Sequence, residues 1–416
     1  MTDIVARDSI ARGKPPHWTV SLLVVLFMLV CVFDPANVLT QAKVPLFVAL
    51  WLATALNMAV TKSEMNVPVE LLTYVLAFIA IPLLSIIWYN FSDGNGLFEG
   101  FALFKGYILI LFAVALVLNR IDAIPLLCMA LTGVAVLAIA VFVYIGLDPG
   151  TYDSLKRVAD PTGTLILDRR RYGQHVELLQ AYFVTSPMLL LSTAYYFHRA
   201  MTEGNRRRLA LWSLVALNVA GMIVGGTRNN ILGAMLLLFC LWPLYTRKMA
   251  RNAFVSIVLL LIFALPFLTQ LRSFFDVNEP ANHIKLELLH DYKQMFLDDP
   301  MTLFIGKGLG AYQYWNSRGF NFYISELTYL EMIRNFGLFG AAAMMTLLLT
   351  PVSFAFVAGG QRDRALAVSY ALYLVMCVTN PNLFSSMGIL ILSVLLADAA
   401  MHREGRPAQI LSVSDG

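Results

Sequence analysis

Charged residues are scarce in this chain. Of its 416 residues, 13% are Asp, Glu, Lys or Arg and 59% are hydrophobic, and the mean hydropathy is +0.70. Soluble proteins carry about 25% charged residues, so this composition excludes an ordinary soluble enzyme, and no nucleic-acid partner is expected. Cysteine is also rare: Cys31, Cys128, Cys240 and Cys377 lie far apart within apolar runs. Neither disulfides nor a metal site are therefore expected.

Two other patterns are missing. The sequence lacks the short alternating segments of a β-barrel and the internal repeats of transporters built from repeated halves. Instead, its apolar runs are about 17 to 23 residues long, enough to cross about 30 Å of hydrocarbon as helix. The first 18 residues are polar for too long to be a cleavable signal peptide. The sequence predicts an all-α polytopic membrane protein without strands.

About twelve transmembrane helices are expected. Residues 1–270 hold the first nine with a basic loop at 147–176, residues 271–335 form one large polar loop, and residues 336–416 hold the last three and a cytoplasmic tail. Lipid tolerates no unsatisfied backbone, so we expect the large loop outside the bilayer. The expected spans are 18–34, 44–60, 67–89, 101–119, 124–146, 177–197, 209–225, 229–246, 253–270, 336–358, 365–379 and 382–400.

Lysine and arginine are unevenly distributed among the loops. If both termini are cytoplasmic, the short outside loops at 35–43, 90–100 and 380–381 hold only Lys43. This agrees with the positive-inside rule, which applies to short loops. The two long outside segments nevertheless carry many basic residues. Their charge favours an anionic ligand on the outer side, although long loops also translocate whatever their charge.

Arg228 is the first candidate for that ligand. It lies in Gly225–Asn230, GGTRNN, between two apolar runs with almost no loop. An arginine at such depth costs a few kcal/mol unless it is paired or faces water, so a functional role is the first interpretation. An arginine that anchors a helix end at the interface is the alternative. Its planar guanidinium suits phosphate oxygens.

Three consecutive arginines form the second cationic feature. Arg169, Arg170 and Arg171 lie in the segment DRRRYGQH. They either contact lipid headgroups or form a phosphate clamp that faces Arg228 across a cavity. Arg171 is nearest the following span, and Arg170 points elsewhere if the segment is helical. The sequence does not choose between them.

The large loop begins with a helical pattern. Apolar residues recur at helical spacing over 283–298, from Ile284 to Phe296, which predicts an amphipathic helix lying on the outer membrane interface. Asp299-Pro300 ends this helix. The glycines of Gly306–Gly310 permit a tight turn, and a conformational role is favoured over phosphate binding.

Two acidic residues near the end of the loop have different expected roles. Glu331 and Arg334 are spaced to pair on a helix surface, a modest structural contribution. Glu326 has no basic residue in the next turn of the sequence. A carboxylate at the mouth of a cavity is a reasonable general base.

Three segments in this order resemble the O-antigen ligase and O-antigen polymerase superfamily. They are GGTRNN, DDPMTLFIGKGLGAYQYW and ELTYLEMIRNFGLFG, within approximately residues 170–340. The resemblance implies a metal-independent, cofactor-free glycosyltransferase with the C-type membrane fold. It implies an active site on the periplasmic side of a bacterial inner membrane, an undecaprenyl-diphosphate-linked glycan donor and a glycan acceptor. A chain-length co-polymerase is an expected partner.

The resemblance also assigns residues. Arg228 matches the arginine of the first motif and is expected to bind the diphosphate, helped by Arg170 or Arg171. A second family arginine falls at Lys285, which keeps the charge but loses the bidentate fork, so His283 or Arg272 could substitute. The remaining substrate-lining candidates are Tyr312, Trp315, Tyr323, Tyr329 and His283. Their aromatic members could stack on sugars or sit in the headgroup belt.

Glu326 separates the possible functions. It occupies the position where the family's ligases have histidine, so the resemblance favours a polymerase of lipid-linked repeat units that makes O-antigen or exopolysaccharide, with Glu326 as base. An O-antigen ligase that transfers glycan to lipid A-core is the nearer alternative. A flippase or transporter is the more distant one, because its ionisable residues would lie near the bilayer midplane. Sugar identity, linkage and stereochemistry stay open.

Overall fold

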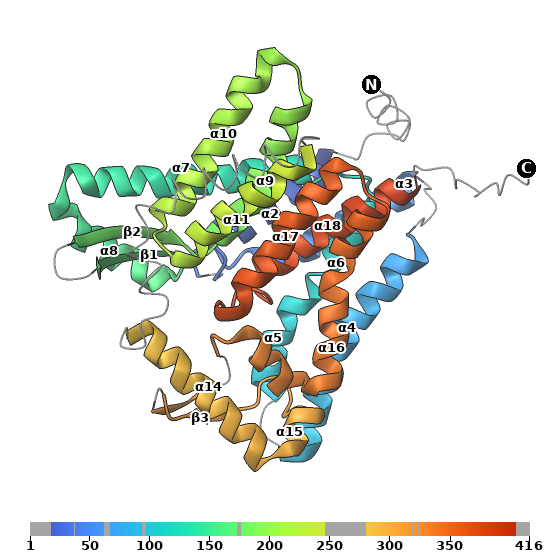
Figure 1. Ribbon diagram of the computed structural model, residues 1–416. Coiled ribbons are helices and arrows are strands. Elements are labelled where there is room, and N and C mark those ends of the chain that lie inside the picture. Colours follow the sequence, from blue (N-terminus) through green and yellow to red (C-terminus); the bar gives the residue numbers. More distant parts are fainter. Residues whose placement is uncertain are drawn as a thin grey trace, which may run out of the picture.

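The computed structural model describes residues 18–36, 38–61, 67–93, 97–172, 176–245, 280–317, 319–322 and 325–404. Within these ranges the chain is mostly helical, with two small β-hairpins (Figure 1). The expected span at 253–270, Arg272 and Tyr323 lie outside the described residues, as do the side chains of Arg170 and Arg171.

The helices follow the apolar runs of the sequence. In the first part of the chain they are α2 (Trp18–Phe33), α3 (Lys43–Thr61), α4 (Val69–Asp93), α5 (Leu97–Ile108), α6 (Leu111–Leu118), α7 (Ile124–Leu147) and α8 (Tyr152–Ala159). In the second they are α9 (Leu189–Thr202), α10 (Asn205–Val224), α11 (Arg228–Tyr245), α14 (Pro280–Asp298), α15 (Pro300–Phe304), α16 (Thr328–Val357), α17 (Gln361–Met376) and α18 (Ser386–Glu404).

Six helical stretches are long and apolar enough to cross a membrane. They are Lys43–Val60, Val69–Phe91, Leu97–Leu118, Ile124–Leu147, Arg206–Val224 and Thr328–Val357, and α2 and most of α18 are shorter apolar helices. The described residues therefore support a polytopic helical membrane protein. They do not reach the expected count of twelve spans.

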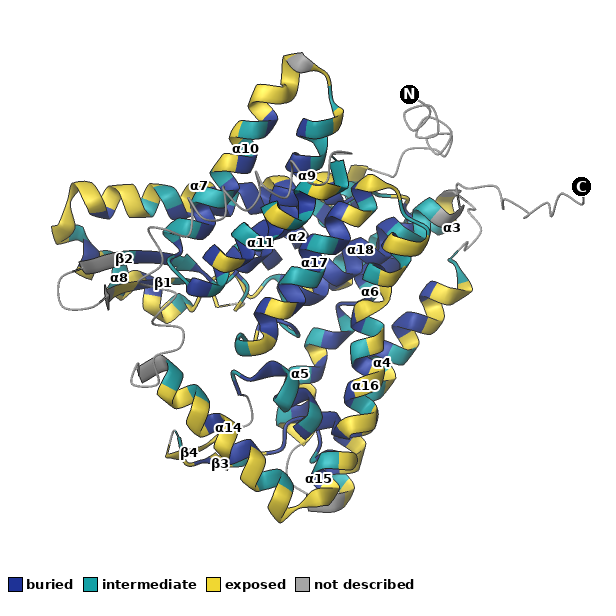
Figure 2. Ribbon diagram, viewed as in Figure 1, coloured by how far each residue is buried: buried dark blue, intermediate teal, exposed yellow. Residues whose placement is uncertain are grey.

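The outward face of α3 is that of a lipid-facing helix. Its exposed apolar residues are spaced four apart, which places them on one stripe, and they are Val44, Val48, Leu52, Leu56 and Val60. By contrast, α6 is apolar all round and nearly all buried, as expected of a helix inside a bundle. Figure 2 shows buried residues gathered in the middle of the molecule, where α18 packs against α2 and α6.

The expectation that strands are absent is wrong. β1 (Leu165–Tyr172) and β2 (Val176–Phe183) form an antiparallel hairpin. The apolar run expected as a span from residue 177 therefore starts as a strand, and its helix, α9, begins only at Leu189. The physical reason is a small separate core, in which the register partners Leu167 and Ala181 are buried together with Tyr152 of α8.

The described residues of 280–317, 319–322 and 325–327 form a cap beside the first part of α16, seen in the lower part of Figure 1. It contains α14, α15 and a second hairpin, β3 (Gln313–Trp315) with β4 (Phe320–Phe322). The buried residues Leu288 and Tyr292 of α14 pack with Trp315 and Leu327. Part of the apolar side of α14 thus packs into the core of the cap, while Leu286, Leu289 and Leu297 of the same helix stay exposed.

The glycine-rich segment of the cap packs tightly against α4 and α16. Gly308 has a φ of +106°, and a Cβ there would lie 2.2 Å from the Cβ of Tyr89. Gly337 in α16 has a φ of +67°, and a Cβ there would lie 2.2 Å from the carbonyl oxygen of Phe304. Such contacts admit no side chain. The expected conformational role of these glycines agrees with this packing.

Gly337→Ala is therefore expected to destabilise the protein by at least about 2 kcal/mol, because it combines a left-handed backbone with a clash against fixed backbone. The thermal unfolding midpoint of purified protein in detergent measures the effect. Gly146→Ala is the control, since a Cβ at Gly146 meets nothing within 4 Å. An unfolding midpoint as high for Gly337→Ala as for Gly146→Ala would contradict the packing described.

Candidate functional site

Arg228 lies buried at the start of α11. Its exposed fraction is 9%. Gly226, with a φ of +62°, connects α10 to α11 in a turn too short for a loop, and the backbone N–H of Asn230 donates to Thr227 Oγ1 at 3.3 Å. Arg228 is thus the first residue of α11, at the positive end of the helix dipole. A cation at this end of a helix favours an anion beside it.

The β1–β2 hairpin contacts this turn directly. Gln180 of β2 donates through Nε2 to the carbonyl oxygen of Gly226 at 2.8 Å. Across the hairpin, Asp168 pairs with Gln180 and Arg170 pairs with Leu178. Paired residues, and residues two apart on one strand, lie on the same face of a sheet. Arg170 therefore occupies a position on the same hairpin face as Gln180, whose side chain contacts the turn before Arg228. Because the segment is a strand and not a helix, successive residues alternate between the two faces, and this alternation decides which arginine shares the face of Gln180.

Arg169 and Arg171 occupy positions on the other face of the hairpin. The register pairs Arg169 with Leu179 and Arg171 with Glu177. The guanidinium carbon of Arg169 lies 4.2 Å from the centre of the Tyr152 ring, a cation–π contact with α8. In the backbone register, the position of Arg170 and not that of Arg171 thus shares the strand face of Gln180.

One turn joins the segments that carry Arg228 and Glu326. It consists of the 3-10 helix η5 (Cys377–Thr379) and Asn380, between α17 and α18. Asn229 Nδ2 donates to Thr379 Oγ1 at 3.0 Å, and Thr328 Oγ1 donates to the carbonyl oxygen of Asn380 at 2.8 Å.

The same turn also reaches the β1–β2 hairpin. Asn380 Nδ2 donates to the Tyr182 hydroxyl at 3.2 Å, and Tyr182 shares the hairpin face of Gln180. Burial raises the pKa of Tyr182, so its phenol stays protonated at neutral pH. The Thr379–Asn380 turn is therefore hydrogen-bonded to α11, to α16 and to the β1–β2 hairpin.

Glu326 lies half-buried directly before α16. Its carbonyl oxygen accepts the backbone N–H of Thr328 at 3.1 Å, so the start of the helix fixes its backbone. The neighbours Ser325 and Leu327 are buried. Glu326 is thus two residues before Thr328, which contacts the Asn380 turn.

The expected pairing of Glu331 with Arg334 is confirmed, but not on a helix surface. Arg334 is fully buried, and its Nε lies 2.9 Å from Glu331 Oε2. Tyr292 donates its hydroxyl to the same carboxylate at 2.7 Å, and burial followed by the Glu331 charge raises the Tyr292 pKa well above its ordinary value. The pair therefore fastens α14 of the cap to α16.

Trp315 does not line a site. Its exposed fraction is 1%, and its ring centre lies 4.8 Å from that of Tyr292, so it belongs to the core of the cap and corrects the expectation. Tyr312 is exposed on the cap and donates to Glu99 Oε1 at 3.2 Å. Tyr329 is half-buried and donates to the carbonyl oxygen of Leu374 at 2.6 Å.

His283 and Lys285 lie on the first two turns of α14. His283 is nine residues before Tyr292, about 13 Å along a helix axis, and so is well separated from the Glu331 contact. Its Nδ1 lies 3.4 Å from Glu287 Oε1 on the exposed side.

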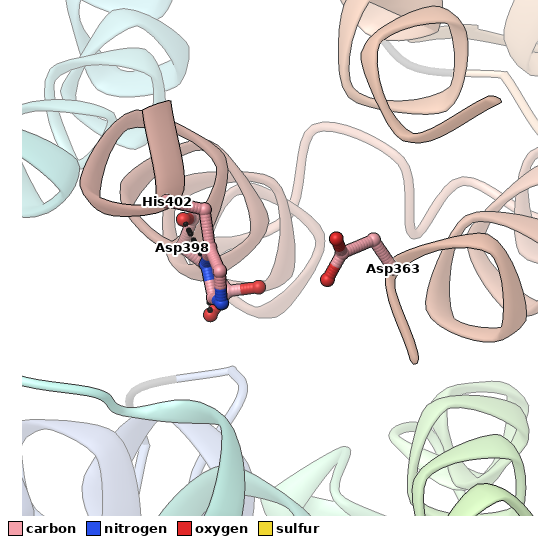
Figure 3. Close-up of side chains that lie close together, drawn as sticks. All are labelled: Asp363, Asp398 and His402. Carbon is pink, nitrogen blue, oxygen red and sulfur yellow. Dashed lines mark hydrogen bonds and ion pairs between the residues drawn. The ribbon is translucent and has the colours of Figure 1, made fainter. Parts of the chain in front are cut away.

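One group of side chains has the spacing of metal ligands. Atoms of Asp363, Asp398 and His402 lie within 4.8 Å of one another (Figure 3). However, Arg362 Nη1 lies 3.2 Å from Asp398 Oδ1, and this guanidinium competes with any cation for that carboxylate. Asp363 lies about 20 Å from the far end of α17, so the group is an ion-pair cluster remote from the Asn380 turn.

Comparison with models of known protein families gives no match for this chain, and a search of curated proteins finds none either.

Two polar contacts of this site could not be predicted from the sequence. They involve Asn229, Thr328, Thr379 and Asn380. The signal available was the position of Asn229 and Asn380 in very short turns between apolar runs, where a polar side chain needs a partner. Nothing in the sequence pairs these turns with each other.

Proposed function

We propose that this protein is a membrane glycosyltransferase that polymerises undecaprenyl-diphosphate-linked oligosaccharide repeat units. The product is O-antigen or exopolysaccharide, and the reaction takes place on the periplasmic side of the bacterial inner membrane. The full proposal includes twelve spans and a C-type glycosyltransferase fold. Its main support is the buried Arg228 at the start of α11, linked through Thr379 and Asn380 to the helix that follows Glu326.

The proposed reaction needs one cation and one base. Arg228 holds the diphosphate of the donor, with Arg170 on the adjoining hairpin face and Lys285 supplying further positive charge. Glu326 accepts the proton of an acceptor hydroxyl, whose oxygen attacks the anomeric carbon of the donor. The bond between that carbon and the phosphate oxygen breaks, and the diphosphate leaves with the electron pair. Stabilising the charge on the leaving group is the largest contribution expected.

An O-antigen ligase would use the same donor and the same residues. The polymerase is favoured because a carboxylate, Glu326, stands where the ligases that this sequence resembles have histidine. A transporter is disfavoured because its ionisable groups would lie near the bilayer midplane, whereas Glu326 adjoins the extramembrane cap.

The test is reconstitution of the purified protein in vesicles that contain defined undecaprenyl-diphosphate-linked repeat units. A ladder of longer lipid-linked glycans, formed without an ion gradient, is expected. Transfer of a single glycan block to added lipid A-core without any ladder would favour the ligase. Absence of any new glycosidic bond would reject both enzymes.

Glu326→Gln is expected to slow chain extension by about 100-fold or more, because general-base catalysis contributes roughly this much, while donor binding is retained. Initial rates at saturating donor and the donor dissociation constant measure the two effects. Glu287→Gln is the control, since Glu287 is exposed on α14. Wild-type rates for Glu326→Gln would move the role of base elsewhere.

A further inference from the structure

Thr328 uses its hydroxyl in an unusual way. It is the first residue of α16, and its exposed fraction is 5%. The hydroxyl of a threonine at the start of a helix commonly forms a hydrogen bond with the helix's own backbone. Here the residue before the helix, Leu327, forms no side-chain hydrogen bond with the helix backbone. The Thr328 hydroxyl instead donates 2.8 Å across to the carbonyl oxygen of Asn380, 52 residues away in the sequence.

The opposite side of the same turn is held in a similar way. Thr379 Oγ1 accepts from Asn229 Nδ2 at 3.0 Å, and Asn229 follows Arg228 directly. The backbone carbonyl of Asn380 and the hydroxyl of Thr379 are adjacent along the chain. The turn therefore receives one hydrogen bond from the segment of Arg228 and one from the segment of Glu326.

The turn is itself fixed in place. Asn382 Nδ2 donates to the carbonyl oxygen of Val184 at 3.1 Å, and the buried Tyr373 donates its hydroxyl to the carbonyl oxygen of Asn382 at 3.0 Å. Asn380 also contacts Tyr182 of the hairpin. A turn fixed on this many sides can act as a rigid spacer between the two helices.

We propose that Thr328 and Thr379 are positioning residues that set the separation between the Glu326 carboxylate and the Arg228 guanidinium. This inference rests on the proposed function. Base and leaving-group ligand must be held to within a fraction of an ångström, and a shift of about 1 Å costs roughly 100-fold in rate. Their hydroxyls touch neither substrate nor the reacting atoms; they act through the two groups that do.

The test compares variants that keep or remove the hydroxyl. Thr328→Val is expected to lower kcat by roughly 10- to 100-fold and to leave KM for the lipid-linked donor within about twofold, because binding groups are unchanged. Thr328→Ser keeps the hydroxyl, so its kcat is expected within about threefold of wild type. Thr379→Val and Thr379→Ser should show the same contrast.

Ser192→Ala separates positioning from general stability. Ser192 of α9 is buried and donates to Asn218 Oδ1 of α10 at 2.6 Å, a contact that does not involve the Asn380 turn. Its loss removes a comparable hydrogen bond and is expected to shift the thermal unfolding midpoint about as much as Thr328→Val, with wild-type kcat. Equal kcat losses in Ser192→Ala and Thr328→Val, or in Thr328→Ser and Thr328→Val, would overturn the positioning role.

The positioning role and the proposed function fail differently. If wild-type protein extends chains and Arg228→Ala does not, but Thr328→Val retains wild-type kcat, the positioning role alone is rejected. If wild-type protein forms no glycosidic bond from lipid-linked repeats, the proposed function is rejected, and the positioning role with it.

Discussion

Replacement of Arg228 by alanine is expected to abolish chain extension, with a fall in rate of at least about 100-fold. The guanidinium is buried at the positive end of α11, where few waters can take over its role toward a diphosphate. Losing one preorganised donor to a developing negative charge typically costs a factor of about 100 to 1,000. The rate of ladder formation by reconstituted protein measures this effect.

Two matched variants sharpen the result. Arg228→Lys keeps the charge but not the bidentate fork, so partial activity is expected. Arg169→Ala removes an arginine that is directed to the Tyr152 ring on the other face of the hairpin, and wild-type product lengths are expected. Near-normal ladders from Arg228→Ala, in protein that remains in the membrane, would remove Arg228 from the mechanism.

Glu331→Ala is expected to be the most destabilising single substitution among those considered. It leaves the guanidinium of Arg334, which is fully buried, without its carboxylate. Breaking a buried ion pair from one side costs about 3–5 kcal/mol. Because Tyr292 loses its acceptor at the same time, the cap should detach from α16 before the helical bundle unfolds.

Proteolysis of the cap and the unfolding midpoint in detergent report these two events. The double variant Glu331→Leu/Arg334→Met removes both charges and should recover much of the stability. Glu203→Ala breaks a half-exposed pair with Arg199, where an effect of at most about 1 kcal/mol is expected. Equal midpoints for Glu331→Ala and Glu203→Ala would show that the buried pair does not hold the cap.

The helices were predictable because their signal is local. The run over α3 predicts a span at 44–60, and the helix covers Lys43–Thr61. The span expected at 124–146 appears as Ile124–Leu147. In both cases length and apolarity alone decide the structure.

The β1–β2 hairpin was not predictable from the same signal. Leu165, Ile166 and Leu167 do not alternate with polar residues, and the arginines that follow resemble a charged loop. The strand is stabilised by long-range packing of Leu167 and Ala181 with Tyr152. Such tertiary packing overrides local propensity.

The site was predictable only in part. The motifs single out Arg228 and Glu326, but the contacts that link their segments join Asn229 to Thr379 and Thr328 to Asn380, which no spacing rule reveals. Similarly, the sequence spacing of Glu331 and Arg334 predicts their pairing. Their burial depends on packing against the cap helix α14, whose sequence pattern is also typical of a helix at the membrane interface.

The most direct measurement is the binding of undecaprenyl diphosphate, without sugar, to purified wild-type protein and to Arg228→Ala. We expect the dissociation constant to rise by roughly 10- to 100-fold in the variant, since hydrogen bonds to a charged group contribute about 1.5–3 kcal/mol, and to stay unchanged in Arg169→Ala. Equal affinity of wild-type protein and Arg228→Ala for the lipid diphosphate would contradict the proposal that this arginine holds the donor.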